Sequence, residues 1–342
     1  MKLRLTLFVI LLAVALLIRC KKDDSNTFVG IRDHSFLIVL IQNGCDTDGD
    51  GKISLTEARA VKSLNINGRN ISDLSGIESF SNLEKLDCGN NTFTELKLTG
   101  NHALKILVTE SCNLSKLDIS GATSLTYLDC VSNHLTTLDV SKNTLLDTIY
   151  CFYNQLDRLS FENNPLLRKV ACGSNKLNSI NVSKNIAITF LDCFYNNLGS
   201  LDITNNISLT YLECSQNMLG VADGSLDVSK NTSLKYLNCG YNLPLYKIDV
   251  TKNINLEYLA CSNSHITSLD LTNNNALATL YCGKNGLTVL NISKNTSLKT
   301  LFINDMPSLT KVCVWGLPFP TVGLTLNTTN SLNVYFSTDC SK

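Results

Sequence analysis

The sequence predicts a solenoid of stacked turns, predominantly β-structure, in which each turn carries two short strands and the turns together build two parallel sheets. Two observations predict this fold. Nine cysteines from Cys88 to Cys282 recur at spacings of 42, 21, 21, 21, 21, 25, 22 and 21 residues. Within one unit, the segment Leu128-x-Cys130-x-x-Asn133 is followed ten residues later by a similar segment that ends at Asn143. Because alternate residues of a strand face opposite sides, each segment predicts one strand whose apolar residues point inward.

Stacking between neighbouring turns must stabilise such a fold, because a turn of 21 residues cannot bury its own apolar face. An asparagine follows each of the two predicted strands and recurs from unit to unit, forming two columns. An amide side chain can satisfy both the donors and the acceptors of a buried bend, so we interpret these columns as structural. We assign the solenoid to residues 63–309 and a C-terminal cap to residues 310–342.

The N-terminus has the pattern of an export signal. Lys2 and Arg4 precede an apolar run from Leu5 to Ile18, which is shorter than the roughly 20 residues of a membrane span. Cys20 follows, and its position resembles that of the lipidated cysteine in a bacterial lipoprotein signal. We therefore expect residues 1–19 to be a lipoprotein signal peptide and Cys20 to carry a lipid. A plain secreted protein and an uncleaved anchor are the alternatives.

Residues 20–28 are expected to be a tether between the lipid and the folded chain. The tether contains the short run Lys21-Lys22-Asp23-Asp24. This run resembles the signal that sends some lipoproteins to the outer face of the outer membrane. The predicted location is therefore the cell surface, with the membrane contacted only through the N-terminal lipid.

A calcium loop is predicted between two short helices. Residues 46–57 match the pattern D-x-[DN]-x-[DN]-G-x₅-E at every defined position. Calcium takes six to eight oxygen ligands in such loops, here with the backbone carbonyl of Lys52 at position seven. The predicted ligand residues are Asp46, Asp48, Asp50, Lys52, Ser54 and Glu57. The loop and its flanking apolar segments predict a small helical calcium-binding cap over residues 29–62, and an acidic turn without metal is the alternative.

Most of the 14 cysteines are expected to be core residues rather than disulfide partners. The nine that follow the repeat occupy one inward column, where neighbouring side chains run parallel and disulfide geometry is poor. Buried cysteine packs as a small hydrophobe. Cys313 and Cys340 differ, because they flank the irregular C-terminal segment. We predict a disulfide between them as a staple that closes this end of the solenoid.

A binding surface is predicted on the first sheet, where the outward residues vary from unit to unit. Exposed aromatic residues that gather in one patch are typical of binding surfaces, and Tyr is favoured because it combines an apolar ring with a polar end. A protein or a sugar could be the ligand, and cross-strand packing that stiffens the sheet is the alternative interpretation. A further Tyr column, three residues before the Cys slot, is interpreted as structural. The predicted ligand-binding residues are Tyr150, Phe152, Tyr153, Phe194, Tyr195, Tyr241 and Tyr281.

Charge and motif content exclude two classes of function. The chain has 29 basic and 29 acidic residues, so it carries no charge excess for neutralising the phosphates of nucleic acid. The four histidines fall on different units or outside the repeats, and no nucleophile stands at a fixed spacing from any of them. We therefore expect a binding protein and not an enzyme.

The repeat also has a recognisable form. Residues 125–135 follow L-x-x-L-x-L-x-x-N-x-L with Cys in the third apolar position. The chain resembles bacterial surface leucine-rich-repeat lipoproteins that combine Cys-containing 21-residue repeats with an N-terminal EF-hand-like or dockerin-like calcium loop. The resemblance implies a leucine-rich-repeat solenoid that acts as an adhesin or protein-interaction module. A glycan-binding accessory lipoprotein for polysaccharide capture and a ligandless envelope structural protein are the alternatives.

Overall fold

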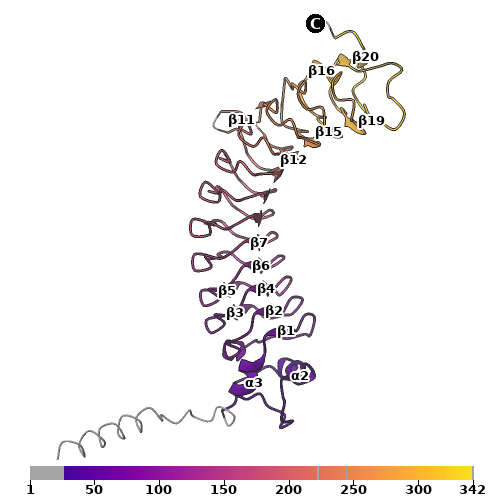
Figure 1. Cartoon of the computed structure of the whole chain (residues 1–342). Coiled ribbons are helices and arrows are strands. Elements are labelled where there is room, and N and C mark those ends of the chain that lie inside the picture. The colour runs from indigo at the N-terminus through magenta and orange to yellow at the C-terminus, as the bar shows by residue number, and fades with distance from the viewer. Residues whose placement is uncertain (1–26, 222, 244, 341–342) are drawn as a thin grey trace, which may run out of the picture.

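A parallel sheet of 13 strands runs along the whole solenoid in this computed structural model, which describes residues 27–221, 223–243 and 245–340 (Figure 1). Each strand pairs in register with the equivalent strand of the next turn, as Leu128 does with Ile149. The strands are β1 Ser63–Asn65, β2 Lys85–Asp87, β4 Ile106–Val108, β6 Tyr127–Asp129, β7 Thr148–Tyr150, β8 Lys169–Ala171, β9 Phe190–Asp192, β10 Tyr211–Glu213, β12 Tyr236–Asn238, β14 Tyr258–Ala260, β15 Thr279–Tyr281, β17 Thr300–Phe302 and β19 Thr325–Asn327. The first predicted sheet is confirmed.

The second side of the solenoid also carries parallel strands, but it is less regular than the sequence predicts. Three short sheets form there. They consist of β3 Glu95–Lys97 with β5 Lys116–Asp118, β11 Ser225–Leu226 with β13 Lys247–Ile248, and β16 Val289–Asn291 with β18 Lys311–Cys313 and β20 Tyr335–Ser337. The predicted continuity of the second sheet is therefore wrong.

Curvature explains this difference between the two sides. The solenoid bends so that the 13-stranded sheet lies on its concave side, with β3, β5 and β11 on the convex side (Figure 1). Backbone hydrogen bonds hold neighbouring strands about 4.8 Å apart, and turns that fan out on the convex side exceed this spacing. Convex aspartates bond within their own turn instead, as Asp139 does when it accepts from the backbone N–H of Ser141 at 2.8 Å.

The core consists of stacked columns of Leu, Ile, Val and Cys. Leu128 and Cys130 have no exposed surface, and the same holds for their equivalents in the next turns. The first Asn column is fully hydrogen-bonded: the amide of Asn154 donates to the carbonyls of Cys130 and Cys151, and its oxygen accepts from the N–H of Leu135. The structural interpretation of the Asn columns is therefore consistent with the contacts.

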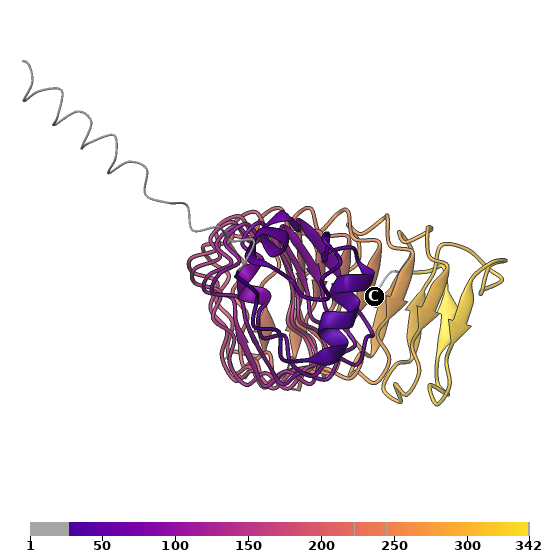
Figure 2. The same cartoon turned by 90° about the horizontal axis from the view of Figure 1, so that it is seen from below.

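Two helices cover the N-terminal end of the solenoid (Figures 1 and 2). Helix α2 spans His34–Gln42, helix α3 spans Leu55–Ala60, and a 3₁₀ helix, η2, follows at Ile77–Ser79. Asp33 caps α2 through one carboxylate oxygen, and its other oxygen accepts two hydrogen bonds from Ser72, which ties the cap to the first turn. The predicted helical cap is confirmed. No helix among the described residues is long and apolar enough to cross a membrane.

The C-terminal segment continues the solenoid instead of forming an irregular cap. Strand β19 pairs with β17, and β20 pairs with β18, so the chain completes a further turn beyond residue 309. Leu326 and Phe336 are only half-buried, whereas their equivalents in the preceding turns have no exposed surface. The last turn lacks a neighbour on one side, which leaves its core columns partly open.

Candidate binding surface and calcium loop

The concave face presents three outward residues per turn. They are the first and third residues of each strand and the residue that follows the Cys position, which around β6 are Tyr127, Asp129 and Val131. In a parallel sheet with in-register pairing, equivalent residues of successive turns form columns about 4.8 Å apart. The face is therefore a grid of columns, and its character at any point depends on which residues occupy neighbouring turns.

A compact aromatic cluster lies at the middle of this face. The rings of Phe152 and Tyr153 meet edge to face at 5.4 Å between centroids, and Tyr153 meets Phe194 at 6.2 Å. Gly173 lies in the turn between them, and a Cβ on this glycine would lie 2.2 Å from the Phe194 ring. The ring of Phe194 therefore covers Gly173 and reaches the turn beyond it. Phe152, Tyr153 and Phe194 are called the aromatic cluster below.

The other predicted ligand-binding residues lie on the same face at different distances from this cluster. Tyr150 packs against Tyr127 at 5.8 Å, and Tyr281 packs against Phe302 at 4.8 Å, both edge to face. The side chains of Tyr195 and Tyr241 are 59% and 51% exposed. The structure thus brings the three residues of the aromatic cluster into contact, whereas Tyr241 and Tyr281 belong to the C-terminal half of the face.

A row of stacked rings lies on the same face and includes three tyrosines of the column that the sequence predicts to be structural. Phe190, Tyr211, Tyr236 and Tyr258 stack nearly parallel, with centroids 4.3, 4.2 and 4.4 Å apart. Strand alternation puts these rings on the same side as the third residue of each strand. Stacking covers the faces of the inner rings, and all four side chains are half-buried, which agrees with a structural role.

Carboxylates alternate with these rings. Glu213 is buried and accepts hydrogen bonds from the hydroxyl of Tyr236 at 3.1 Å, from the amide of Asn238 at 2.8 Å and from Ser215. Asp192 lies on the adjacent strand, opposite Glu213. Burial, together with the charge of Glu213, raises the pKa of Asp192 to about 6, although a hydrogen bond from the backbone N–H of the residue two positions on partly opposes this.

Asp192 should make stability fall as the pH rises. Its folded-state pKa lies above the ordinary value of 3.8, so the folded state favours the protonated form, and the associated stability is lost as pH rises from about 4 through 6. Asp192→Asn should therefore raise the free energy of unfolding at pH 8 by about 2 kcal/mol and change it little at pH 4. Urea unfolding of both chains at the two pH values measures this.

The matched control is Asp202→Asn on the convex side. Hydrogen bonds from Thr204 lower the pKa of Asp202, so its charge stabilises the fold at neutral pH and this contribution is lost on acidification. This variant should lose stability at pH 8, the opposite sign to Asp192→Asn. Equal effects of both substitutions would show that Asp192 is solvated rather than buried.

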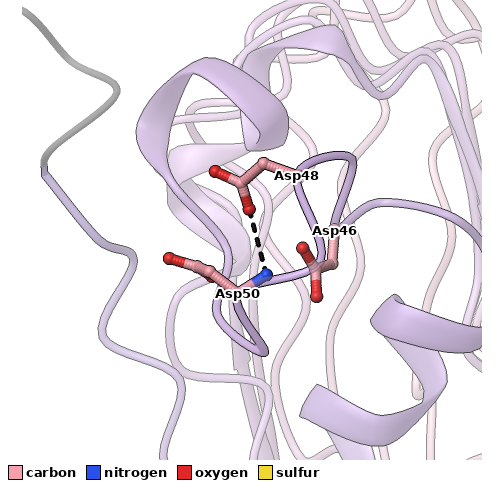
Figure 3. A group of neighbouring side chains, drawn as sticks. All are labelled: Asp46, Asp48 and Asp50. Atoms are coloured by element: carbon pink, nitrogen blue, oxygen red, sulfur yellow. Dashed lines mark hydrogen bonds between the residues drawn. The ribbon is translucent and has the colours of Figure 1, made fainter.

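The predicted calcium loop has its three aspartates in one group. One carboxylate oxygen each from Asp46, Asp48 and Asp50 lies within 4.8 Å of the others (Figure 3). Backbone N–H groups orient the carboxylates: Gly49 and Gly51 donate to Asp46 at 2.8 and 3.0 Å. Both glycines have positive φ, 76° and 80°, as the tight turn requires. Hard oxygen donors gathered in this way fit calcium.

Glu57 is not part of that group of three carboxylates. Its two oxygens accept hydrogen bonds from the N–H and hydroxyl of Thr47 and from the N–H and hydroxyl of Ser54. Burial opposes its ionisation, but these bonds outweigh burial and lower the pKa of Glu57 to about 2. Ser54 in turn caps α3, so Glu57 and Ser54 form a capping box. The part that Lys52, Ser54 and Glu57 would play as ligands stays a prediction.

The N-terminal segment pairs with the calcium loop. Phe28 forms an antiparallel bridge with Ser54, and the N–H of Val29 donates to the carbonyl of Ile53 at 2.8 Å. EF-hand loops normally pair with a second loop, and the sequence contains no second match to the calcium-loop pattern. Here an extended strand takes that position, which connects the loop to the start of the described chain.

The repeat cysteines are free and inert. Cys130, Cys151 and Cys172 have no exposed surface, and burial raises the pKa of each thiol. A thiol that stays protonated is a poor nucleophile and a poor metal ligand. These contacts agree with the expected packing role.

The predicted disulfide between Cys313 and Cys340 is not formed in this structure, where both thiols are free. Cys313 donates to the carbonyl of Asp339 and Cys340 to that of Thr338. Burial together with the neighbouring Cys340 thiol raises the pKa of Cys313 to about 11. A protonated thiol pair is the reduced form of the predicted staple. Cys20, the predicted lipidation site, lies outside the described residues, as does the rest of the signal peptide.

Comparison with known proteins identifies the fold. No protein-family model and no curated protein matches the chain in sequence. The functional domain of InlJ from Listeria monocytogenes, described as including a cysteine ladder, has 31% identity and a TM-score of 0.73 over 83% of this chain. This chain spans 66% of that InlJ domain.

Two further solved structures share the fold at lower identity. The internalin InlF from Listeria monocytogenes has 18% identity and a TM-score of 0.64, covering 91% of this chain and 96% of InlF. The plant peptide hormone receptor RGFR1, solved in complex with RGF2, has 18% identity and a TM-score of 0.55, covering 78% of this chain and 50% of the receptor. This chain is therefore a leucine-rich-repeat solenoid, and bacterial leucine-rich-repeat proteins are among its structural neighbours.

Proposed function

We propose that this chain is a cell-surface binding protein that holds a protein partner on its concave face, centred on the aromatic cluster. The observation that carries the proposal is the assembly of Phe152, Tyr153 and Phe194 across three turns, with Tyr153 remaining 53% exposed. Exposed aromatic residues that contact one another are the usual centre of protein-binding surfaces, because a rigid ring buries much apolar area at small entropic cost.

The fold also supports a protein partner. One solenoid of the same fold, the plant peptide hormone receptor RGFR1, was solved in complex with RGF2. Half-buried Asp192 and buried Glu213 border the aromatic cluster. A partner that brings amide, hydroxyl or cationic donors to these carboxylates would therefore be favoured.

Surface display and calcium complete the proposal. A lipid on Cys20 would anchor the chain at the outer membrane, and residues 20–28 would hold the solenoid away from the lipid. Calcium held by Asp46, Asp48 and Asp50, with Lys52, Ser54 and Glu57 completing the set, would stabilise the cap at the tethered end. The metal would serve structure, since the loop lies at the opposite end of the solenoid from β19 (Figure 1). Strands β1, β2, β4 and β6 also separate that end from β7, where the aromatic cluster begins.

Gly173→Ala tests the aromatic cluster without removing any ring. The added Cβ would lie 2.2 Å from Phe194, so this ring must move away from Tyr153. We expect at least a tenfold loss of affinity for the protein partner. Separating the rings at the centre of a binding surface should weaken the binding free energy by more than about 1.4 kcal/mol. The partner is first found by screening the purified full chain on arrays of extracellular-matrix and host-surface proteins, and the affinities are then measured by surface plasmon resonance.

Gly199→Ala is the matched control, because its Cβ would meet no heavy atom within 4 Å. It should bind like the unaltered chain, and the double change Phe152→Ala with Phe194→Ala should bind as poorly as Gly173→Ala. A protein ligand whose affinity survives both cluster variants would place the site elsewhere. The absence of any protein ligand on the arrays would argue against the proposed function itself.

A further inference from the structure

One position of the repeat has the same unusual backbone conformation in nearly every turn. The residue two positions after the Cys position has a positive φ, between 49° and 56° in the turns from Asn90 to Asp305. Residues with a Cβ disfavour this left-handed region, and Asn and Asp tolerate it best. Bulky tyrosines nevertheless occupy the position at Tyr153, Tyr195 and Tyr241, with φ values of 55°, 49° and 56°.

Burial does not compensate for this strain at two of the tyrosines. Tyr195 and Tyr241 are 59% and 51% exposed. Neither makes a ring contact with another aromatic side chain of the described residues, whereas the inner rings of the stacked row from Phe190 to Tyr258 cover one another. Neither backbone preference nor packing accounts for tyrosine at positions 195 and 241, and strained residues of this kind gather at functional sites.

The spacing of these rings is regular. Gln216 occupies the same column between Tyr195 and Tyr241, so the two tyrosines lie two turns apart. Turns paired through a parallel sheet stack at about 4.8 Å, which places these rings roughly 10 Å apart along the solenoid. That distance is close to the length of one disaccharide in an extended β-1,4-linked chain. Such a chain presents the C–H face of every second sugar on the same side.

A groove of about 350 Å³ lies beside Tyr241 in the C-terminal half of the face. Small residues occupy the position after the Cys slot along this groove, where the middle of the face carries bulkier side chains such as Phe194. Tyr281 and Phe302 also line the groove, and Gln216 and Asn304 contribute amides. The small residues are Gly240, Ser262 and Gly283. The groove therefore combines aromatic walls with neutral hydrogen-bonding groups.

The charges and the backbone pairing around the groove argue against an ionic ligand and against a peptide that adds as a strand. Its two charged lining residues, Lys284 and Asp305, have opposite signs. Hydrogen bonds from Asn330 and Asn304, together with the charge of Lys284, lower the pKa of Asp305, so this carboxylate is already compensated. The strands beneath are interior strands whose backbone groups are paired on both sides, so a peptide cannot add as a further strand. A neutral sugar chain needs only hydroxyl partners and apolar ring faces, and both are present.

We propose that the concave face from Tyr195 towards the C-terminal end of the solenoid binds a neutral β-1,4-linked polysaccharide chain that runs along the solenoid. Tyr195 and Tyr241 stack on alternate sugars, and the groove beside Tyr241 holds hydroxyl groups through Gln216 and Asn304. This site begins next to the aromatic cluster, because Tyr195 follows Phe194 in the chain, and the groove beside Tyr241 contains no residue of the cluster. A protein partner on the cluster and a glycan that extends into the groove are tested by different variants.

The double variant Tyr195→Asn with Tyr241→Asn tests the proposal. Asparagine already occupies this column at positions 90 and 263 with the same φ, so the variant should fold with an equal or higher melting temperature. Isothermal titration of the full chain with cellohexaose, mannohexaose and xylohexaose measures binding. At least one hexasaccharide should bind, and the double variant should weaken that binding at least tenfold. Ser262→Leu, which fills the groove without replacing either tyrosine, should weaken it as strongly.

The control is Phe152→Ala, which removes one ring of the protein-binding cluster two turns from Tyr195 and should leave sugar affinity within twofold. Failure of all three hexasaccharides to bind at millimolar concentration overturns the glycan proposal and leaves the protein-binding proposal standing. Binding that survives both Tyr195→Asn with Tyr241→Asn and Ser262→Leu also overturns it, because the sugar would then sit elsewhere.

Discussion

Asn154→Ala should lower the free energy of unfolding by about 3–5 kcal/mol, whereas Asn164→Ala, ten residues further on, should lower it by only about 1–3 kcal/mol. Both side chains are buried, at 8% and 0% exposed. The amide of Asn154 donates to the carbonyls of Cys130 and Cys151, and its oxygen accepts from Leu135. Alanine would leave the N–H of Leu135 without an acceptor, which costs about 1–3 kcal/mol. The carbonyls of Cys130 and Cys151 would each lose one of two donors and keep the amides of Asn133 and Asn175, and each lost bond costs about 0.5–1.5 kcal/mol.

Asn164 belongs to the second Asn column, and its hydrogen bonds differ from those of Asn154. Its amide donates to the carbonyls of Val140 and Asn143 at 3.0 and 2.8 Å, but its own oxygen is buried without a hydrogen-bond partner in the described structure. Alanine therefore removes one unsatisfied acceptor and two hydrogen bonds, while the carbonyls of Val140 and Asn143 keep backbone N–H donors from Asn143 and Leu146. The gain partly offsets the loss, which is why the smaller effect is expected although Asn164 is the more deeply buried residue.

Urea unfolding followed by circular dichroism measures the difference, with Asn163→Ala as control. Asn163 is exposed and adjacent to Asn164, so its replacement should change the free energy of unfolding by less than about 0.5 kcal/mol. Because stability in a solenoid comes from coupling between neighbours, Asn154→Ala should also broaden the transition. Equal losses for Asn154→Ala and Asn164→Ala would show that the oxygen of Asn164 is satisfied.

Calcium should raise the melting temperature of the full chain, and a chelator should reverse the effect. A metal that binds only the folded state at 100 times its dissociation constant stabilises that state by about 2.7 kcal/mol. Asp46→Ala should abolish this increment, since Asp46 contributes to the group of three carboxylates and accepts the N–H groups of Gly49 and Gly51. Differential scanning calorimetry with calcium and with excess EDTA measures the shift.

Asp157→Ala controls for the loss of an aspartate as such. Asp157 is exposed on the solenoid and pairs with neighbouring Arg158, far in sequence from the loop. This variant should keep the full calcium-dependent shift. A melting temperature that does not respond to chelator in the unaltered chain would contradict the metal site, and the three aspartates would then be an acidic turn held by its own backbone hydrogen bonds.

The parts of this molecule that the sequence predicts well are those set by local periodicity. The 21-residue spacing of the cysteines fixes which residues of each strand point inward, and the structure buries Leu128, Cys130 and their equivalents completely. The calcium-loop pattern likewise places Asp46, Asp48 and Asp50 together, because their spacing and the two glycines act within one short turn. Such features depend only on residues close in sequence.

Features that depend on several turns at once were predicted less well. The continuous second sheet fails because curvature accumulates from turn to turn, and no single repeat reveals how far the convex side opens. The tyrosine column is predicted to be structural, but the sequence does not predict that Tyr211, Tyr236 and Tyr258 stack on one another together with Phe190. Such a stack forms only when the strands of four consecutive turns pair in register, and this pairing cannot be read from a single repeat.

Spacing within one or two units was thus enough to establish the repeat, the solenoid, the inward columns and the aspartate loop. The contacts among the aromatic residues, in contrast, follow from the way successive turns stack. Phe194 reaches Tyr153 because Gly173, in the turn between, has no side chain to block its ring. Tyr195 and Tyr241 share the left-handed backbone of Tyr153, but two turns further on they have Gly240 and Gly283 where Tyr153 has Phe194. These partners lie about two repeats away in the chain, so the geometry of the stack decides which rings meet and which stay exposed.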